Sequence, residues 1–329
     1  AKFTKFKMKT AHMLLLLLLW SVNPINAFVG QGRNALRARL PMARMSSQGR
    51  SLIQMMAANV PYKVNVESLL KNNRARIDSL AQVSPDVPEL TLLRFALAFP
   101  NRDEAASALS EALAWRQGEG RSIVDAATEA VAKAVAGGGW DNEVVRLAAP
   151  HASTINQYIS PKNILTLATA EGDLVYVIRA SLIKDKELMS KVTVQQMANF
   201  FAYVKEVHSI VADARSERTG RLCSVIFAND ITGVRAIPDP KFSEALTSSS
   251  KQYEKLYPSL AGPTMIVNLP FVLQAFVGLI KPLFPKTVQD RLKFRSAPFL
   301  AGLKELTPLT TSDKTRDSFL AEVKRIESM

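Results

Sequence analysis

Few residues of this 329-residue chain could perform acid–base, nucleophilic or metal chemistry. Its histidines are His12, His151 and His208, and its single cysteine is Cys223. One cysteine can form neither an intramolecular disulfide nor a CxxC metal or redox motif, and scattered histidines are a poor set of metal ligands. The sequence also lacks GxSxG, HExxH, GxxxxGK[ST] and a complete GxGxxG motif. It therefore assembles no catalytic triad and no metal site.

The candidate reactive residues all have structural interpretations. His208 lies in the middle of the amphipathic stretch 194–218, where we expect a solvated or capped helix histidine rather than a catalytic base. Cys223 begins an apolar run and is expected to be a small core residue. Asp230 follows that run, and a carboxylate there commonly caps the next turn. The alternative is an α/β enzyme that uses Asp230 or His208.

The most informative segment is apolar. Asn268-Leu-Pro270 closes a β-branched run, and the following residues, 271–284, read FVLQAFVGLIKPLF, with ten of fourteen positions apolar. A helix of this length reaches only about 21 Å, which is too short to span a hydrocarbon core of about 30 Å. One interpretation is a buried core helix. The other is a mobile lid over an apolar cavity, hinged at Pro270 and at Lys281-Pro282 and able to lie on a bilayer when open.

The elements around this segment change along the chain. Helical spacing and caps predict a front of helices, with Asn101 as an N-cap. Farther on, β-branched runs alternate with long helical stretches, which favours an α/β domain with a mostly parallel sheet. The predicted helices cover residues 66–76, 89–99, 101–116, 122–136, 194–218 and 240–257, and the predicted strands cover 174–179, 222–227 and 264–268.

The positive charge is concentrated at the N-terminal end. The net charge is +13, but residues 1–66 carry ten basic residues and no acidic one, so residues 67–329 carry only +3. A nucleic-acid footprint over the folded part is therefore not expected.

The basic end has the composition of targeting segments. Four lysines precede six consecutive leucines at positions 14–19, which is typical of a signal peptide, and we place its cleavage after Ala27. Residues 28–61 contain five arginines and no acidic residue, as in organelle transit peptides. The Ala27-Phe28 junction resembles the bipartite presequences of algae with complex plastids, which implies a plastid location. The alternative is the secretory pathway.

Over residues 88–305 the sequence resembles the Sec14-like, or CRAL-TRIO, lipid-transfer family. The motifs that carry the resemblance are Leu92-Leu93-Arg94-Phe95, Glu104-Ala105-Ala106, Leu113-Ala114-Trp115-Arg116, Asp230-Ile-Thr-Gly233, Tyr257-Pro258, Asn268-Leu-Pro270, Lys281-Pro282-Leu283 and Thr287. The resemblance implies an α/β fold in which an N-terminal helical subdomain precedes a mostly parallel β-sheet, flanked by helices that enclose an apolar cavity. It implies a non-enzymatic protein without cofactor or metal, whose cavity holds one lipid behind a gate helix.

The resemblance also implies a set of ligand-binding residues. Tyr176 and Phe227 would line the floor of the cavity, and Ser259, Arg291 and Lys293 would meet a polar or anionic headgroup. Phosphatidylinositol-binding members have an acidic residue at the position of Ser259, so this chain departs from them. Lys281 would touch membrane phosphates. The gate and part of the cavity wall would be formed by Phe271, Val272, Leu273, Ala275, Phe276, Val277, Leu279 and Ile280.

The resemblance thus implies a protein that binds one lipid or hydrophobic small molecule, such as a pigment, an isoprenoid or a tocopherol-like compound, in an internal cavity closed by the gate helix. Such a protein would transfer or present this ligand between membranes, with transient peripheral membrane contact and no nucleic-acid partner. A lipid-sensing regulatory module is the alternative in the same family. The predicted divisions are a signal peptide (1–27), a transit-peptide-like segment (28–61), a helical N-terminal subdomain (62–118), a helix and Gly-rich linker (119–145), the CRAL-TRIO domain (146–310) and a C-terminal helix (311–329).

Overall fold

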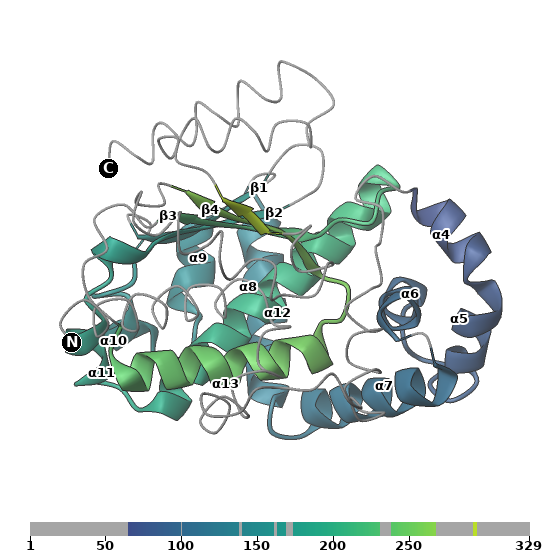
Figure 1. Cartoon of the computed structure of the whole chain (residues 1–329), viewed down its shortest axis with the longest axis horizontal. Coiled ribbons are helices and arrows are strands. Elements are labelled where there is room, and N and C mark those ends of the chain that lie inside the picture. The colour runs from purple at the N-terminus through teal and green to yellow at the C-terminus, as the bar shows by residue number, and fades with distance from the viewer. Residues whose placement is uncertain are drawn as a thin grey trace, which may run out of the picture.

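The computed structural model describes residues 65–99, 101–137, 140–160, 163–168, 174–230, 238–267 and 292–294. A group of helices precedes a sheet against which two long helices pack (Figure 1). The front helices are α4 (Val66–Asn72), α5 (Arg74–Ala81), α6 (Glu89–Ala98), α7 (Arg102–Gln117), α8 (Arg121–Val135), α9 (Asn142–Leu147) and α10 (Ala152–Ile155).

Helices α6, α7 and α8 agree with the sequence prediction, α5 runs beyond the predicted end to Ala81, and α9 and α10 were not predicted. Asn101 caps α7 as predicted, because its side chain accepts hydrogen bonds from the backbone N–H groups of Asp103 and Glu104. The single helix predicted over 66–76 is wrong: the chain leaves helical geometry at Asn73, whose φ is −114°. The Asn73 side-chain Nδ2 donates to the carbonyl of Leu69 at 2.8 Å, and this bond closes the end of α4.

Within the described ranges the sheet has five strands in the order of the sequence, β1 (Ile164–Ala168), β2 (Leu174–Arg179), β3 (Val225–Asp230), β4 (Ala261–Val267) and β5 (Leu292–Phe294). The first strand runs antiparallel to the second, and the other pairings are parallel. The mostly parallel α/β sheet predicted from the sequence is therefore confirmed.

Strand β3 begins later than predicted. Cys223 is fully buried but lies outside the ladder, since its backbone N–H donates to Ser216 Oγ at 2.8 Å and its carbonyl accepts from Arg94. The backbone groups of Cys223 are thus engaged by side chains rather than by a neighbouring strand.

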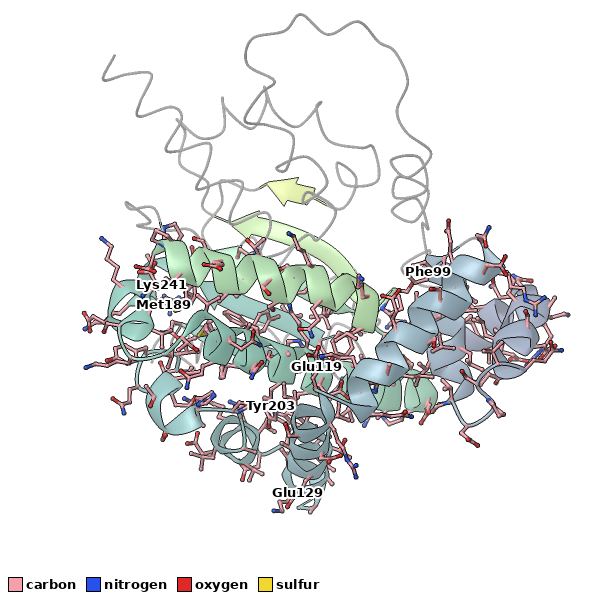
Figure 2. All side chains as sticks on the ribbon, turned by 90° about the horizontal axis from the view of Figure 1, so that it is seen from below. Phe99, Glu119, Glu129, Met189, Tyr203 and Lys241 are labelled. Atoms are coloured by element: carbon pink, nitrogen blue, oxygen red, sulfur yellow. The ribbon has the colours of Figure 1, made fainter. Side chains whose placement is uncertain are left out.

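Helix α12 (Val194–Thr219) lies between β2 and β3, and α13 (Pro240–Leu256) lies between β3 and β4. The 3₁₀ turn Ala180–Leu182 and α11 (Asp185–Met189) precede α12. Thr193 and Gln196 form a capping box at the start of α12, and Gly220, in the left-handed region at φ 67°, ends it. The two helices lie side by side across the sheet (Figure 1). Tyr203 of α12 lies between helices, whereas Glu129 lies on the outer side of α8 (Figure 2).

Both faces of the central strands are buried. Tyr176 of β2 and Phe227 of β3 join the core that the helices form, while Val175 and Ile226, next to them in sequence, point to the other face and are also buried. Such continuously apolar strands are typical of parallel sheets covered on both sides. Within the residues described, no helix is both long and apolar enough to cross a bilayer.

Two arginines, Arg94 and Arg116, connect the front helices to the sheet and α12. Arg94 of α6 is almost fully buried; its Nε donates to Asp213 of α12 at 2.7 Å, and its Nη1 and Nη2 donate to the carbonyls of Ser259 and Cys223. Arg116 of α7 makes a bidentate ion pair with Glu206 of α12. The helical front and the α/β part are therefore held together by charge-assisted hydrogen bonds.

Candidate functional site

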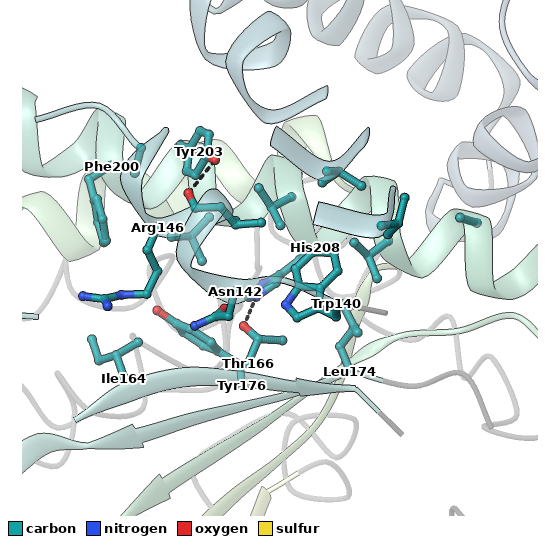
Figure 3. A pocket seen from close by; sticks show the side chains of 18 of the residues that line it. Trp140, Asn142, Arg146, Ile164, Thr166, Leu174, Tyr176, Phe200, Tyr203 and His208 are labelled. Atoms are coloured by element: carbon teal, nitrogen blue, oxygen red, sulfur yellow. Dashed lines mark hydrogen bonds between the residues drawn. The ribbon is translucent and has the colours of Figure 1, made fainter. Parts of the chain in front are cut away.

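A pocket of about 560 Å³ lies between β1 and β2 on one side and helices α8, α9 and α12 on the other (Figure 3). Most of its lining is apolar. The residues that form its apolar wall include Val131, Ile159, Ile164, Leu174, Phe200, Val207 and Val211. Its length follows from α12, because lining residues extend along that helix from Phe200 to Arg218. This elongated, apolar shape suits a hydrophobic guest.

Tyr203 fixes the position of α12 relative to α9 at the edge of this pocket. Its hydroxyl donates to the carbonyl of Val145 at 2.8 Å, and burial raises the pKa of Tyr203 to about 12. A buried tyrosine needs such a partner, so this bond both satisfies the hydroxyl and holds two walls of the pocket together.

A small group of polar side chains interrupts the apolar lining. Nε2 of His208, on α12, lies 2.7 Å from Oγ1 of Thr166, on β1. The ring of Tyr176, on β2, meets the His208 ring edge to face at a centroid distance of 4.9 Å. Figure 3 shows Thr166 rising from the strands toward His208, with the Tyr176 side chain on the same side of the sheet. Three separate elements thus bring these residues together.

The sequence prediction that His208 is a solvated or capped helix histidine is wrong, because the residue is buried. It is only 3% exposed, because Val204 and Val211, one helical turn away on either side, belong to the same pocket-facing side of α12. Burial, with a smaller contribution from the charge of Lys205, lowers the pKa of His208 to about 3. The imidazole is therefore neutral near pH 7. The residues at positions 204 and 211 are the signal that could have revealed its burial.

Of the residues predicted to line the cavity floor, Tyr176 lines this pocket. Phe227 pairs with Tyr176 in register across β2 and β3, and the two rings meet edge to face at 6.1 Å. Phe227 is thus on the same face of the sheet and supports the ring that lines the pocket. Burial raises the pKa of the Tyr176 hydroxyl.

The rim of the pocket combines exposed apolar and basic side chains. Trp140 and Val135 are 37% and 49% exposed, and both line the pocket. Arg146 of α9 and Arg218 of α12 are further lining residues. Two groups of Arg146 are already used: Nη1 donates to Glu143 at 3.0 Å and Nη2 donates to the carbonyl of Ile159 at 3.2 Å.

The predicted headgroup residues are only partly described. Ser259 has a left-handed φ of 55° in the loop before β4, where its carbonyl accepts from Arg94, and it does not line the pocket among β1, β2 and α12. The backbone of Lys293 lies in β5 and pairs with Met265 of β4. Outside the described residues are Arg291, Lys281 and the predicted gate residues Phe271, Val272, Leu273, Ala275, Phe276, Val277, Leu279 and Ile280.

The alternative catalytic residue Asp230 ends β3 and is buried. Its Oδ2 lies 3.9 Å from Nε of Arg179, at the end of the neighbouring strand β2. His151, just before α10, is exposed. No hydrogen bond or ion pair within the described residues joins His151 to Asp230 or to His208. Across the described ranges, no cluster of three or more His, Cys, Asp or Glu side chains could hold a metal ion.

Comparison with known proteins finds a family match for the α/β part. Residues 160–310 match the family model of the CRAL/TRIO domain. Among solved structures, a match is the crystal structure of Sfh5, with 16% sequence identity, a TM-score of 0.39, and coverage of 78% of this chain and 82% of that chain. No curated protein matches the sequence.

Proposed function

Because this chain contains a CRAL/TRIO domain over residues 160–310, we propose that it binds a single lipid or hydrophobic small molecule in an internal cavity and transfers or presents it between membranes. Domains of this family typically bind lipids or other hydrophobic ligands and are generally non-enzymatic. The observation that carries the proposal is the family match together with the apolar pocket, whose walls β1, β2 and α12 lie within the matched range and whose walls α8 and α9 precede it.

The size and lining of the pocket support a hydrophobic ligand. A volume of about 560 Å³ lies within the range of small-molecule sites, which are mostly apolar with few polar groups. The polar residues of the lining include Thr166, Tyr176 and His208, together with Asn142, Asn156, Arg146, Arg215 and Arg218. We take this pocket as the part of the ligand cavity that lies between the sheet and α12.

The energetics explain how such a cavity promotes transfer without bond chemistry. Moving an 18-carbon chain into water costs roughly 14 kcal/mol at about 0.8 kcal/mol per CH₂, so unaided exchange between bilayers is slow. A protein cavity need not bind the chain more strongly than the bilayer does, because both environments are apolar. It only has to provide a path that avoids water.

In our proposal the apolar segment 271–284 is the gate, with Pro270 and Lys281-Pro282 at its hinges. Opening would let the segment lie on a bilayer, and Lys281 would then contact lipid phosphates. The headgroup of the ligand would meet Ser259, Arg291 and Lys293. The N-terminal residues 1–61 would direct the chain to a plastid.

A transfer assay between liposomes tests this proposal. Phe276→Asp places a charge in the proposed gate and is expected to abolish protein-dependent transfer of a fluorescent phospholipid or tocopherol from donor to acceptor liposomes. A matched control is Val83→Asp on the helical front, where the native side chain is already 58% exposed, and it should leave transfer unchanged. Transfer by Phe276→Asp at the rate of the unmodified chain would remove the gate assignment.

A lipid-sensing role is the second candidate, and the ties between the front helices and the sheet domain favour it. Asp213 and Glu206, the acceptors of Arg94 and Arg116, lie on α12, the helix that also walls the pocket. Ligand occupancy could therefore change how the front helices dock. The prediction is that adding ligand slows amide exchange in α6 and α7 while transfer between liposomes is absent.

A further inference from the structure

The pocket between the sheet and helices α8, α9 and α12 opens to solvent where α8 and α12 end. Of the residues that line it, the exposed ones are Val135, Trp140, Ala214 and Arg218, and the others are half-buried or buried. Val135 ends α8 and Trp140 follows that helix, while Ala214 and Arg218 belong to the C-terminal part of α12. Helices α8 and α12 pack against each other. We call these four residues the mouth of the pocket.

Two large apolar side chains of the mouth are exposed to water. Val135 is 49% exposed and Trp140 is 37% exposed. The other exposed large apolar side chains among the described residues are Val83, Leu147 and Leu182, and none of them lines the pocket. Apolar surface of this kind gains free energy when a nonpolar phase covers it, and tryptophan is enriched at the interface between bilayer and water.

The charge around the pocket has a single sign. Its charged lining residues are Arg146, Arg215 and Arg218, and no aspartate or glutamate is among the lining residues. Arg146 is paired with Glu143, whereas Arg218 is exposed and forms no ion pair with any residue that the structure describes. An unpaired cation beside exposed apolar groups is complementary to a surface that offers both anions and an apolar phase.

A bilayer suits this mouth better than a protein partner does. In the proposed function the ligand passes between a bilayer and the pocket, and a protein seated on the mouth would close that route. Direct contact between the mouth and a bilayer removes water from the route, so the apolar chain of the ligand is never exposed. In such a contact Arg218 would meet lipid phosphates while the Trp140 indole lies in the interfacial layer.

We propose that Val135, Trp140 and Arg218 form a membrane-docking surface that binds bilayers containing anionic lipids. Val135 and Trp140 enter the interfacial layer, and Arg218 binds the phosphates. This surface is separate in sequence from the segment 271–284, to which the proposed function assigns the gate. The proposal rests on the proposed function and adds to it the surface through which the pocket meets the membrane.

An environment-sensitive label at the mouth tests this proposal. Cys223 is the only cysteine and is buried, so a thiol-reactive nitrobenzoxadiazole label on Val135→Cys in the full chain reports position 135 alone. Vesicles of phosphatidylcholine that contain phosphatidylglycerol should shift the label's emission to the blue, because the label leaves water. The same label on Val83→Cys is the matched control, since Val83 is also exposed but lies on the helical front, and its emission should not shift. Because this readout is local, adhesion of the basic residues 1–66 to the vesicles does not produce it.

A second pair of variants tests the role of charge. Arg218→Gln, introduced into the labelled Val135→Cys chain, should raise the lipid concentration at half-maximal shift about fivefold, as expected for one cation close to an anionic surface. Lys71→Gln is the matched control and should leave that concentration unchanged, because Lys71, like Arg218, is an exposed cation in the last turn of its helix. On vesicles of phosphatidylcholine alone, Arg218→Gln should have no effect.

Quenching of native tryptophan gives an independent measurement that does not depend on labelled variants. Brominated phosphatidylcholine, mixed with phosphatidylglycerol, should quench the emission of the unmodified chain more than that of Trp140→Phe. Equal quenching of the two chains would contradict the insertion of Trp140.

The outcomes separate this proposal from the proposed function. A label at position 135 that stays in water on vesicle-bound chains would overturn the docking surface and leave the mouth to an acidic protein partner. Equal shifts at positions 83 and 135, or equal effects of Arg218→Gln and Lys71→Gln, would also overturn it. Liposome transfer that continues without insertion at position 135 removes the docking surface and keeps the proposed function. Insertion at position 135 without any transfer supports the docking surface and removes the proposed function.

Discussion

Replacing Arg116 by methionine should destabilise the chain strongly, because it leaves Glu206 as a buried charge without its counter-ion. Glu206 is 0% exposed; its two carboxylate oxygens accept from Arg116 at 2.7 and 2.5 Å, and Oε2 also accepts from the Tyr257 hydroxyl at 2.8 Å. Removing one partner of a buried ion pair costs about 3–5 kcal/mol. The Arg116 side chain is 32% exposed, so water screens part of the interaction. We therefore expect the free energy of unfolding to fall by about 3 kcal/mol, the lower end of this range.

Urea unfolding followed by circular dichroism measures this loss. With a denaturant dependence of about 2–3 kcal/mol/M, the midpoint should fall by about 1 M. Lys133→Met is the matched control, since it removes the cation of the exposed Glu129–Lys133 pair and should not move the midpoint measurably. A midpoint for Arg116→Met equal to that of Lys133→Met would refute the view that the Arg116–Glu206 pair holds α7 on α12.

Three further predictions concern folding stability. Between pH 6.5 and 5 the unfolded chain binds a proton at His208 that the folded chain does not, so the free energy of unfolding should fall as the pH falls. Urea unfolding at the two pH values should show that this free energy falls by about 1–2 kcal/mol more for the native chain than for His208→Leu. Gly120→Ala places a methyl group 2.5 Å from the Trp115 ring and should cost about 1–3 kcal/mol in thermal unfolding, whereas Gly137→Ala, in open space, should cost no clash energy. Asn101→Ala removes the cap of α7 and should cost about 0.5–2 kcal/mol in urea unfolding; an unchanged midpoint would contradict the capping role.

The parts of the fold that sequence predicts well are those governed by local signals. Strand β2 was predicted at its observed bounds because a β-branched run follows a turn-like Glu-Gly-Asp sequence. Helix α12 begins at Val194 as predicted, and the Thr193–Gln196 capping box fixes that end. Strand β1 was missed, because the five residues ILTLA are too short for periodicity to distinguish a strand from a helix.

The candidate site depends on contacts that are distant in sequence. Tyr176 was placed in the cavity from family resemblance, and it lines the pocket that the structure contains. The sequence predicts a solvated or capped histidine at His208, because it lies in the middle of an amphipathic helix, whereas the structure places it on the pocket-facing side with Val204 and Val211. Its partner Thr166 is 42 residues away, in a strand that the pattern did not predict. Sequence patterns report local geometry, whereas such a pair is set by tertiary packing.

The central claim is that this chain carries one hydrophobic guest molecule. Its most direct test is native mass spectrometry of the purified full chain, followed by organic extraction and mass spectrometry of the extract. The account predicts one intact hydrophobic molecule per chain, released when the protein unfolds. A bare chain mass after purification from a lipid-rich source, with nothing recovered in the organic phase and nothing bound after incubation with lipid vesicles, would contradict it.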